Sequence, residues 1–559
     1  MTWPKAIPGL TVALLVLSGA ARAAPPVVPG AGTIIHEAEP VTPPAPSSSG
    51  TGLSIESPQS QQPAAGAPFA VKTLRITGNT VFEAATLHAL VADAEGQELT
   101  LSRLHELTTR ISDYYHAHGY PLARAIIPAQ TVRDGLVSIE VIEARYDSVE
   151  LDNHSRVRDG LLRATLAPLQ SGQLIAQAPL DHVLLLLSDV PGALTTATLK
   201  PGDTVGTSAL AVQSTAGPEI TGDVALDNYG SRYTGDARFG GTVNLIDPLH
   251  LGDVLSASAL TSGHRMNYGR LGYELLLDGA GLRAGAAYSG LHYELGDSLA
   301  ALDGTGSAQV ASVWARQPLM RTPTVNVYGQ IQFDHKRLDD ELGASDIRTD
   351  RHLNNWTASL AGDWRDAWLT GAVNSWSVAG SAGQVVFDNA SAQLTDAATA
   401  RTQGRFAKGS ASVDRLQNLG PQDALNLALS AQWSSANLDE SEKLVGGGPY
   451  SVRAYDVDAL SGDVGYLGSL EYRHILAEAA GGQWQTVAFV DSEHLTANKS
   501  PWTAGAHSAT FSGAGIGLNF TARARWYVKG FLAVPFGPTP ELIGANKSAR
   551  VWAELGWNF

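Results

Sequence analysis

The sequence contains no cysteine among its 559 residues. A disulfide framework, a thiolate nucleophile and a cysteine metal site are therefore all excluded. After residue 24 the sequence also lacks any apolar run as long as the roughly 20 residues that a membrane-spanning helix needs. Residence in a membrane would then require a β-barrel, the other fold that satisfies its backbone hydrogen bonds inside lipid.

Basic residues are scarce relative to acidic ones, with 38 Lys and Arg against 54 Asp and Glu and a net charge of −16. Nucleic-acid binding needs a basic surface, so we expect no nucleic-acid partner. Catalytic motifs are missing too. The sequence has no His-Glu-x-x-His, no Gly-x-Ser-x-Gly and no phosphate-binding loop. We therefore expect no catalytic residue, no metal site and no cofactor, and predict that the protein is not an enzyme.

The first 67 residues are predicted to lie outside any folded domain. Residues 1–23 have the pattern of a secretory signal peptide, because Lys5 precedes an apolar run and Ala21-Arg22-Ala23 supplies a small-x-small cleavage site. Residues 24–67 are dense in Pro, Ala, Ser and Gly, a composition that buries too little apolar surface to offset the entropy of ordering. We predict that this second segment is a mobile linker.

Two small α+β modules are predicted next, over 68–144 and 145–217. Each is expected to follow the order β-α-α-β-β, because apolar residues recur first at strand spacing and then at helical spacing. In the first module we expect strands near 74–76, 120–127 and 136–142 and helices over 82–94 and 101–118. In the second we expect strands near 149–151, 194–199 and 208–214 and helices over 157–166 and 180–188.

Residues 218–559 are predicted to form a transmembrane β-barrel. Segments of about ten residues alternate apolar and polar side chains between Gly, Asp, Asn and Ser turns, which is typical of barrel strands. Clear examples are 425–434, 522–529, 551–559 and 325–334, where Gly329 interrupts the apolar row. At roughly 20 residues per strand and connection, this length predicts about sixteen antiparallel strands. A soluble β-sandwich would also alternate, but charged inward rows and the length of the region argue against it.

Two tandem modules before a barrel resemble the transporter (TpsB) family of two-partner secretion, within the POTRA-barrel superfamily of outer-membrane assembly factors. The strongest resemblance is a loop motif that the family folds back into the barrel: Gly447, Gly448, Val452, Arg453, Ala454 and Tyr455. Ala454 stands where the family usually has Gly, which puts the local backbone geometry in question. Phe489 and Asp491 resemble the family's lumen-facing strand motif. We expect Arg453 and Asp491 to pair, since an Arg carried into a barrel needs a carboxylate.

Weaker matches lie at other positions. Tyr115, Gly119 and Tyr120 resemble the end of the second helix of the first POTRA domain, although any helix capped by Gly would match. Trp557 and Phe559 resemble the signal that the barrel-assembly machinery recognises, and both also suit an interfacial aromatic girdle. The family often has a plug helix near the mature N-terminus, for which residues 32–41 are only a short candidate.

The resemblance implies an outer-membrane transporter with periplasmic N-terminal domains. Its partner would be a large unfolded exoprotein, captured in the periplasm and passed through the barrel to the cell surface; haemolysins, adhesins and contact-dependent toxins are such cargo. The cargo gene is expected beside that of its transporter. Lipid and the barrel-assembly machinery are the other expected partners. The alternatives are a barrel-assembly insertase of the same superfamily, which usually has more than two POTRA modules, and a porin-like channel, which lacks a periplasmic head.

Overall fold

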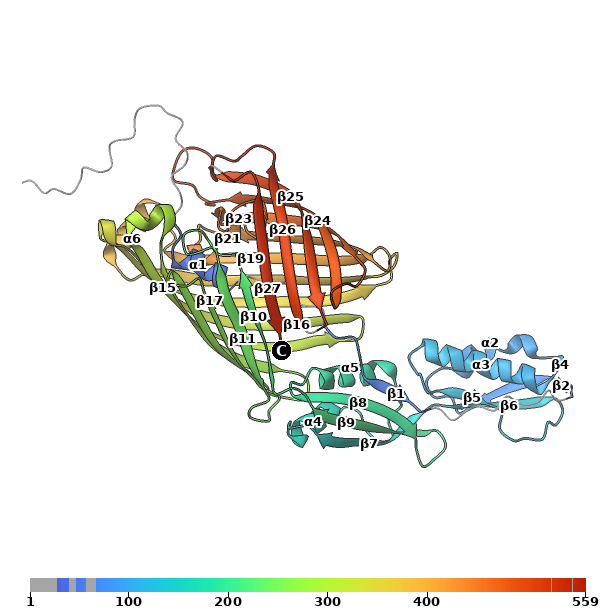
Figure 1. Ribbon diagram of the computed structural model, residues 1–559. Coiled ribbons are helices and arrows are strands. Elements are labelled where there is room, and N and C mark those ends of the chain that lie inside the picture. Colours follow the sequence, from blue (N-terminus) through green and yellow to red (C-terminus); the bar gives the residue numbers. More distant parts are fainter. Residues whose placement is uncertain (1–27, 40–46, 57–66, 524, 545) are drawn as a thin grey trace, which may run out of the picture.

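The computed structural model describes residues 28–39, 47–56 and 67–559, except 524 and 545. The predicted signal peptide, residues 1–23, lies outside the described residues. No helix in the described part of the chain is long and apolar enough to cross a membrane. The molecule consists of a barrel and two small α+β units that extend from one end of it (Figure 1).

The barrel is one closed sheet of sixteen strands within the described residues. Each strand pairs with its neighbour in antiparallel register, and the last strand, β27, pairs with the first, β10, to close the cylinder. The strands are β10 Ile220–Asp227, β11 Arg238–Ile246, β12 Val254–Thr261, β13 Met266–Leu276, β14 Arg283–Glu294, β15 Gly304–Arg321, β16 Val325–Leu342, β17 Ile347–Asp366, β18 Ala372–Phe387, β19 Gly404–Asn418, β20 Asp423–Ser434, β23 Val464–Ile475, β24 Gly482–Thr496, β25 Ser508–Ala522, β26 Trp526–Phe536 and β27 Arg550–Asn558.

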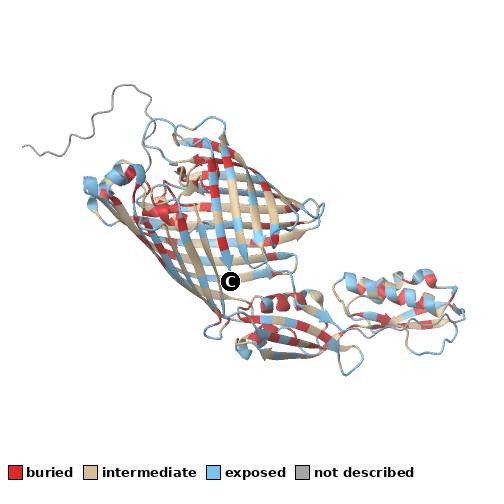
Figure 2. Cartoon of the chain, viewed as in Figure 1, coloured by how far each residue is buried: buried red, intermediate tan, exposed pale blue. Residues whose placement is uncertain are grey.

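Burial alternates along the barrel strands, as a wall with two different faces requires (Figure 2). In β20, Leu427, Leu429 and Trp433 are exposed, whereas Asn426 and Gln432, on the alternate row, are buried. The apolar row therefore faces lipid and the polar row faces the lumen. The predicted barrel of about sixteen strands is confirmed, and the sheet is closed rather than divided into the two sheets of a sandwich.

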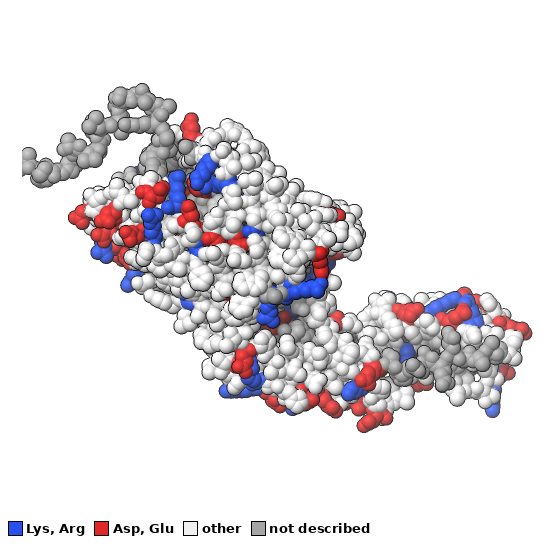
Figure 3. Space-filling model, in the orientation of Figure 1, with Lys and Arg blue, Asp and Glu red and all other residues white. Residues whose placement is uncertain are grey.

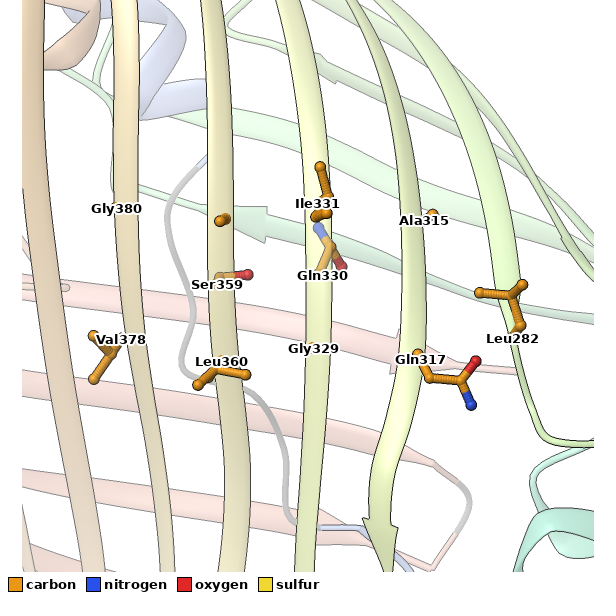
Figure 4. A pocket seen from close by; sticks show the side chains of 11 residues that line it. Leu282, Ala315, Gln317, Gly329, Gln330, Ile331, Ser359, Leu360, Val378 and Gly380 are labelled. Carbon is orange, nitrogen blue, oxygen red and sulfur yellow. The ribbon is translucent and has the colours of Figure 1, made fainter.

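Gly329 interrupts the apolar row of β16, and a hollow of about 590 Å³ lies at this point of the wall. Figure 4 shows Gly329 and Gly380 on neighbouring parts of the sheet, with Leu360 and Val378 beside them. The gap is therefore a shallow depression rather than a break in the strand.

The alternation over 522–529 does not form one strand, contrary to our prediction. Strand β25 ends at Ala522 and β26 begins at Trp526. Arg525, with a φ of 68°, turns the chain between them. The alternation of apolar and polar residues continues across the short turn, so the alternation alone could not show where β25 ends and β26 begins.

The first small unit contains two helices, α2 Ala84–Ala89 and α3 Leu101–Ala117, and the short 3₁₀ helix η1 Ala92–Ala94. Its main sheet has the order β3-β6-β5, and a second sheet pairs β2 with β4. The strands are β2 Phe69–Val71, β3 Thr73–Thr77, β4 Gln97–Leu99, β5 Arg124–Ile126 and β6 Leu136–Ile142. The helix expected over 82–94 is thus two short helices, and the pair β2 and β4 was not predicted.

The second small unit has a sheet of order β1-β8-β9-β7 with helices α4 Asp159–Leu166 and α5 Gln177–Ser188. Its strands are β7 Arg145–His154, β8 Ala193–Pro201, β9 Thr207–Ala216 and β1 Leu53–Ile55. Strand β1 comes from the predicted linker and pairs in parallel with β8. The linker prediction is therefore wrong for this segment. Strand β8 supplies hydrogen bonds that order β1, and the composition of the segment gives no sign of this pairing.

The second unit packs directly against the barrel. Leu276, at the end of β13, belongs to the same apolar core as helices α4 and α5. Arg321, at the end of β15, is 1% exposed and binds both carboxylate oxygens of Asp189 at 2.7 and 2.8 Å. Its Nη1 also donates to the Ser48 carbonyl at 2.7 Å. One buried arginine thus joins the barrel, the second unit and the segment before β1.

Helix α1, Ala31–Ala38, lies inside the barrel near the end opposite the two small units (Figure 1). Ile34 and Ile35 are buried in a cluster with side chains of the barrel wall. Three further short helices lie in connections at that end: η2 Asp297–Leu302, η3 Gly343–Ser345 and α6 Ala390–Ala398. Helix α1 also falls in the predicted linker. Its folding depends on the lumen that surrounds it, which the local composition does not reveal.

Candidate functional site

The connection between β20 and β23 folds back into the barrel. It contains the 3₁₀ helix η4 Glu440–Glu442 and a hairpin formed by β21 Leu444–Gly446 and β22 Leu460–Gly462. Gly447 and Gly448 turn the chain at the end of β21 with φ of 89° and 88°. A Cβ at Gly447 would overlap the carbonyl oxygen of Asp456, so this turn requires glycine. We refer to residues 447–459 as the loop tip.

Arg453 of the loop tip is buried against the barrel wall. Its Nε and Nη2 donate to the two carboxylate oxygens of Asp491 on β24, at 2.8 and 2.7 Å. Its Nη1 donates to Glu471 on β23 at 2.6 Å. The guanidinium also lies 3.5 Å from the ring centroid of Phe489. The loop motif and the strand motif from the sequence are therefore in direct contact, and two carboxylates rather than one face the arginine.

The backbone of the loop tip is held as well. The indole Nε1 of Trp552 on β27 donates to the Arg453 carbonyl at 2.7 Å, and Asn546 donates to the Ala454 carbonyl at 3.1 Å. Val452, Ala454 and Tyr455 are at most 1% exposed. Glu471, Trp552 and Asn546 were not identified from the sequence, because nothing in their local pattern distinguishes them from other lumen residues.

Ala454 fits where the resemblance expects glycine. In the described chain, the non-glycine residues with a positive φ do not include Ala454. Its methyl group faces Gly513 on β25, and a Cβ at Gly513 would overlap it. The backbone therefore tolerates Ala454, and Gly513 on the barrel wall leaves the space that the methyl group of Ala454 occupies.

Helix α1 and the loop occupy the lumen together. Helix α1 packs against η4, and the Ala31 amide donates to Asp340 at 2.7 Å. Arg351 contacts Asp340 at 2.7 Å and also binds Asp439, next to η4. Lys336 and Lys408 each lie 2.7 Å from Glu442 of η4. Ion pairs with the wall thus hold the η4 region, and a hydrogen bond holds the start of α1, which fits the short plug candidate that the sequence left open.

Two acidic side chains meet between α1 and the loop tip. Glu37 of α1 is 6% exposed and lies next to Asp458. Burial raises the pKa of both carboxyls, and the charge of Glu37 raises the pKa of Asp458 further. Arg238 donates to the Glu37 backbone carbonyl at 2.9 Å rather than to either carboxylate. Two adjacent buried carboxylates would repel each other if both were ionised. While α1 is seated, that is, in its position inside the barrel, Glu37 and Asp458 therefore favour sharing a proton.

Tyr115 in the first small unit donates from its hydroxyl to Glu143 at 2.8 Å. Burial raises the pKa of Tyr115. Gly119, with a φ of 88°, ends the helix, and Tyr120 packs edge-to-face with Tyr115. The Gly119 carbonyl accepts a hydrogen bond from Gln177 of the second unit at 2.8 Å. This motif therefore lies where the two units meet.

At the end of the chain, Trp557 stacks on Trp526 with ring centroids 6.0 Å apart. Phe559 exchanges two backbone hydrogen bonds with Gly222, at 2.9 and 3.0 Å. Both aromatic residues therefore lie at the seam where β27 meets β10. The described residues contain no group of three or more His, Cys, Asp or Glu that could hold a metal ion.

Family comparisons agree with this architecture. The family "POTRA domain, ShlB-type" matches residues 69–144, and "Haemolysin secretion/activation protein ShlB/FhaC/HecB" matches residues 206–520. The heme/hemopexin transporter protein HuxB of Haemophilus influenzae strain 86-028NP is 25% identical over 445 residues, which cover 79% of this chain and 78% of HuxB. The outer membrane transporter CdiB of Escherichia coli is 24% identical over 485 residues, covering 83% and 79%.

Solved structures share the fold. CdiB from Escherichia coli superposes with a TM-score of 0.68 at 21% identity, covering 90% of this chain and 93% of CdiB. BamA from Haemophilus ducreyi lacking POTRA domains 1–3 gives a TM-score of 0.53 at 12% identity, covering 88% and 100%. At these identities the likeness is one of fold.

Proposed function

Because the chain belongs to the ShlB/FhaC/HecB family of haemolysin secretion/activation proteins, and is an outer-membrane transporter of two-partner secretion with periplasmic POTRA domains, we propose a route for its cargo. An unfolded exoprotein binds the POTRA domains, enters the barrel, and displaces α1 and the loop tip on its way to the surface. The insertase and porin alternatives are not favoured, since the matching family is one of secretion proteins.

The observation that carries this proposal is the filled lumen. Helix α1, η4 and the loop tip lie inside the closed barrel. The Ala31 amide of α1 bonds to Asp340, and ion pairs of Arg351, Lys336 and Arg453 hold the η4 region and the loop tip to the wall. A chain that passes through this barrel has to move at least one of these parts. These polar contacts are combined with apolar clusters of Ile34 and Ile35 and of Val452 with the wall, so displacement has to break both kinds of contact.

Capture is proposed to occur at sheet edges of the POTRA domains. An extended peptide can add to an exposed strand, where main-chain hydrogen bonds recognise it largely without regard to sequence. Strands β3 and β5 are the edges of the first main sheet, and β7 is one edge of the second. At the other edge of the second sheet, β1 from this chain already pairs with β8. It marks a strand-accepting edge, which supports this mode of capture.

Further partners follow from the same proposal. Lipid surrounds the exposed apolar rows. The barrel-assembly machinery binds the chain end that carries Trp557 and Phe559 during insertion. We also propose that the chain catalyses no reaction of its own and that cargo folding outside the cell supplies directionality.

Deleting residues 71–217 tests the capture role. We expect the variant to insert as a barrel, seen as heat-modifiable migration on a gel, but to export no cargo. A matched variant that lacks only α6, residues 390–398 on the opposite side of the membrane, should still export. Export by the POTRA deletion at the level of the full chain would exclude capture by these domains.

A further inference from the structure

The outer faces of β16 and β17 change character along their length. The lipid-facing pairs pass from Ile331 with Ala358 to Phe333 with Trp356, whose ring centroids are 5.0 Å apart. Beyond this aromatic pair the same outward rows are polar and charged. They contain His335, Arg337 and Asp339 on β16 and Asp350, His352 and Asn354 on β17. A sharp boundary between apolar and charged rows therefore crosses this part of the outer wall.

The position of the charged rows corresponds to the lipid headgroups of the outer leaflet. Aromatic girdles mark the membrane interface in outer-membrane barrels. Arg337 follows Phe333 by four residues, which is about 13 Å along a strand and about 10 Å along the membrane normal at a tilt of about 40°. These strand ends lie opposite the periplasmic domains. Figure 3 shows acidic and basic side chains gathered at that end of the barrel, beside a largely uncharged belt.

The charged side chains surround a hollow of about 410 Å³. Its lining consists of His335, Arg337, Asp339, Asp350, His352 and Asp388. The imidazole Nδ1 of His352 lies 2.8 Å from Asp388, which follows β18, and Nδ1 of His335 lies 2.9 Å from Asn354 Oδ1. The two imidazole rings are 6.0 Å apart. Three strands therefore build one polar hollow on the membrane side of the wall, outside the lumen.

Arg337 forms no ion pair or side-chain hydrogen bond with any residue in the described chain, whereas Arg348 nearby is paired with Asp350 at 2.9 Å. Its planar guanidinium is suited to two parallel hydrogen bonds with a phosphate. The carboxylates in the same hollow would repel a bare phosphate, but they accept hydrogen bonds from hydroxyl groups. The combination of one open arginine, two histidines and three carboxylates therefore fits a sugar phosphate better than either phosphate or sugar alone.

We propose that this hollow binds the headgroup of a phosphorylated glycolipid of the outer leaflet. Arg337 binds the phosphate, with His335 and His352 beside it, and Asp339 and Asp388 accept hydrogen bonds from the sugar hydroxyls. The acyl chains then extend along Trp356, Phe333 and Ile331, of which Trp356 and Ile331 are 60% and 58% exposed. The site lies apart from the transport route, so its occupancy is independent of the cargo.

Native mass spectrometry of the full-length protein in detergent tests the proposal, with diphosphoryl lipid A as the probe. We expect one tightly bound lipid A per chain. Arg337→Ala should weaken its binding about tenfold or more, since a bidentate phosphate contact is lost. Asp388→Asn should also weaken it, through the sugar contacts. Arg523→Ala removes an exposed arginine at the periplasmic end and should leave binding unchanged.

Competing ligands separate the sources of the phosphate. Phosphatidylglycerol and inorganic phosphate should not displace lipid A at concentrations at which unlabelled lipid A does. Equal binding by the wild type and Arg337→Ala would overturn the proposal. Equal competition by phosphatidylglycerol would also overturn the proposal, because the hollow would then recognise any anionic lipid. Competition by inorganic phosphate would overturn it as well, because the hollow would then be a site for a free anion.

Discussion

The guanidinium of Arg453 meets the carboxylate of Asp491 side-on, with Nε 2.8 Å from Oδ2 and Nη2 2.7 Å from Oδ1. Asp491 is fully buried, and Arg453 is 5% exposed. Removing one member of such a pair leaves the other charge buried without compensation, which costs about 3 to 5 kcal/mol. The contact joins the loop tip to the wall. Its loss should therefore destabilise the folded-back position of the loop, whereas the closure of the barrel should not change.

Arg453→Ala is therefore expected to lower secretion of the cargo at least about tenfold while the barrel stays in the membrane. Cargo in the medium, compared with heat-modifiable barrel in the membrane, measures the two effects separately. Arg473→Ala is the matched control, because Arg473 also binds Glu471 but is more exposed and lies on the wall. Unchanged secretion by Arg453→Ala would remove the pair from the mechanism.

Gly513→Ala should displace the loop tip, because the new Cβ would overlap that of Ala454. Such overpacking costs about 1 to 3 kcal/mol. We expect increased protease access to the loop, and we expect Ala454→Gly in the same chain to reverse it. Gly530→Ala on β26 is the control, since the nearest atoms to its added Cβ are 3.9 Å away. If the double variant is as accessible as Gly513→Ala alone, the two residues are not in the contact described.

The position of α1 should depend on pH through Glu37 and Asp458. When α1 is seated, the pKa of each carboxyl is raised, whereas a released Glu37 titrates near its ordinary value of 4.5. The seated state therefore binds more protons, and it loses stability as pH rises from about 4.5 through the raised pKa values.

In planar bilayers, channel opening should increase as pH rises above about 4.5 and through the raised pKa values. Glu37→Gln combined with Asp458→Asn should abolish this dependence, because neither side chain can then ionise. Glu39→Gln, at the end of the same helix, should retain it. A pH response that persists unchanged in the double variant would exclude the acid pair as its source.

Glu143 should stabilise the first POTRA domain. Burial alone would raise its pKa, but hydrogen bonds from Thr80, Val81 and Tyr115 outweigh it and lower the pKa. The stability it contributes is present above its ordinary value of 4.5 and is lost as pH falls through the lowered pKa. Glu143→Gln should cost about 2 to 3 kcal/mol, since charge-assisted hydrogen bonds are lost.

Hydrogen exchange of residues 69–144 in the full-length protein measures this loss. The exposed Glu140→Gln on β6 should change exchange by less than about 0.5 kcal/mol. Equal protection in Glu143→Gln and the wild type would show that the network does not stabilise the domain.

Regular alternation made individual strands predictable, in the first POTRA domain as well as in the barrel wall. Strand β6, Leu136–Ile142, has the predicted bounds, and β20 shows the predicted faces, because each such strand buries one row of side chains. The loop motif could be located only through its resemblance to a family. Its geometry also depends on Glu471 and Trp552, which are 18 and 99 residues from Arg453 in sequence.

Helix α1 was offered only as a short candidate through the resemblance, and strand β1 was not predicted, because neither is stable by itself. A helix of eight residues is too short to fold alone in water, and a strand of three residues needs a partner. Both lie in a segment whose composition indicates disorder. The barrel lumen and the edge of β8 order them, and those surfaces exist only after the rest of the chain has folded.

Site-specific photo-crosslinking to a stalled cargo tests the central claim, that the cargo passes through the lumen. Neighbouring residues of β16 provide the comparison, since Ile331 is 58% exposed on the lipid side and Gln332 belongs to the lumen row. With its exoprotein cargo halted during export, a crosslinker at Gln332 should capture the cargo and one at Ile331 should not. Capture at Ile331 as often as at Gln332, or at neither position, would contradict passage through the barrel.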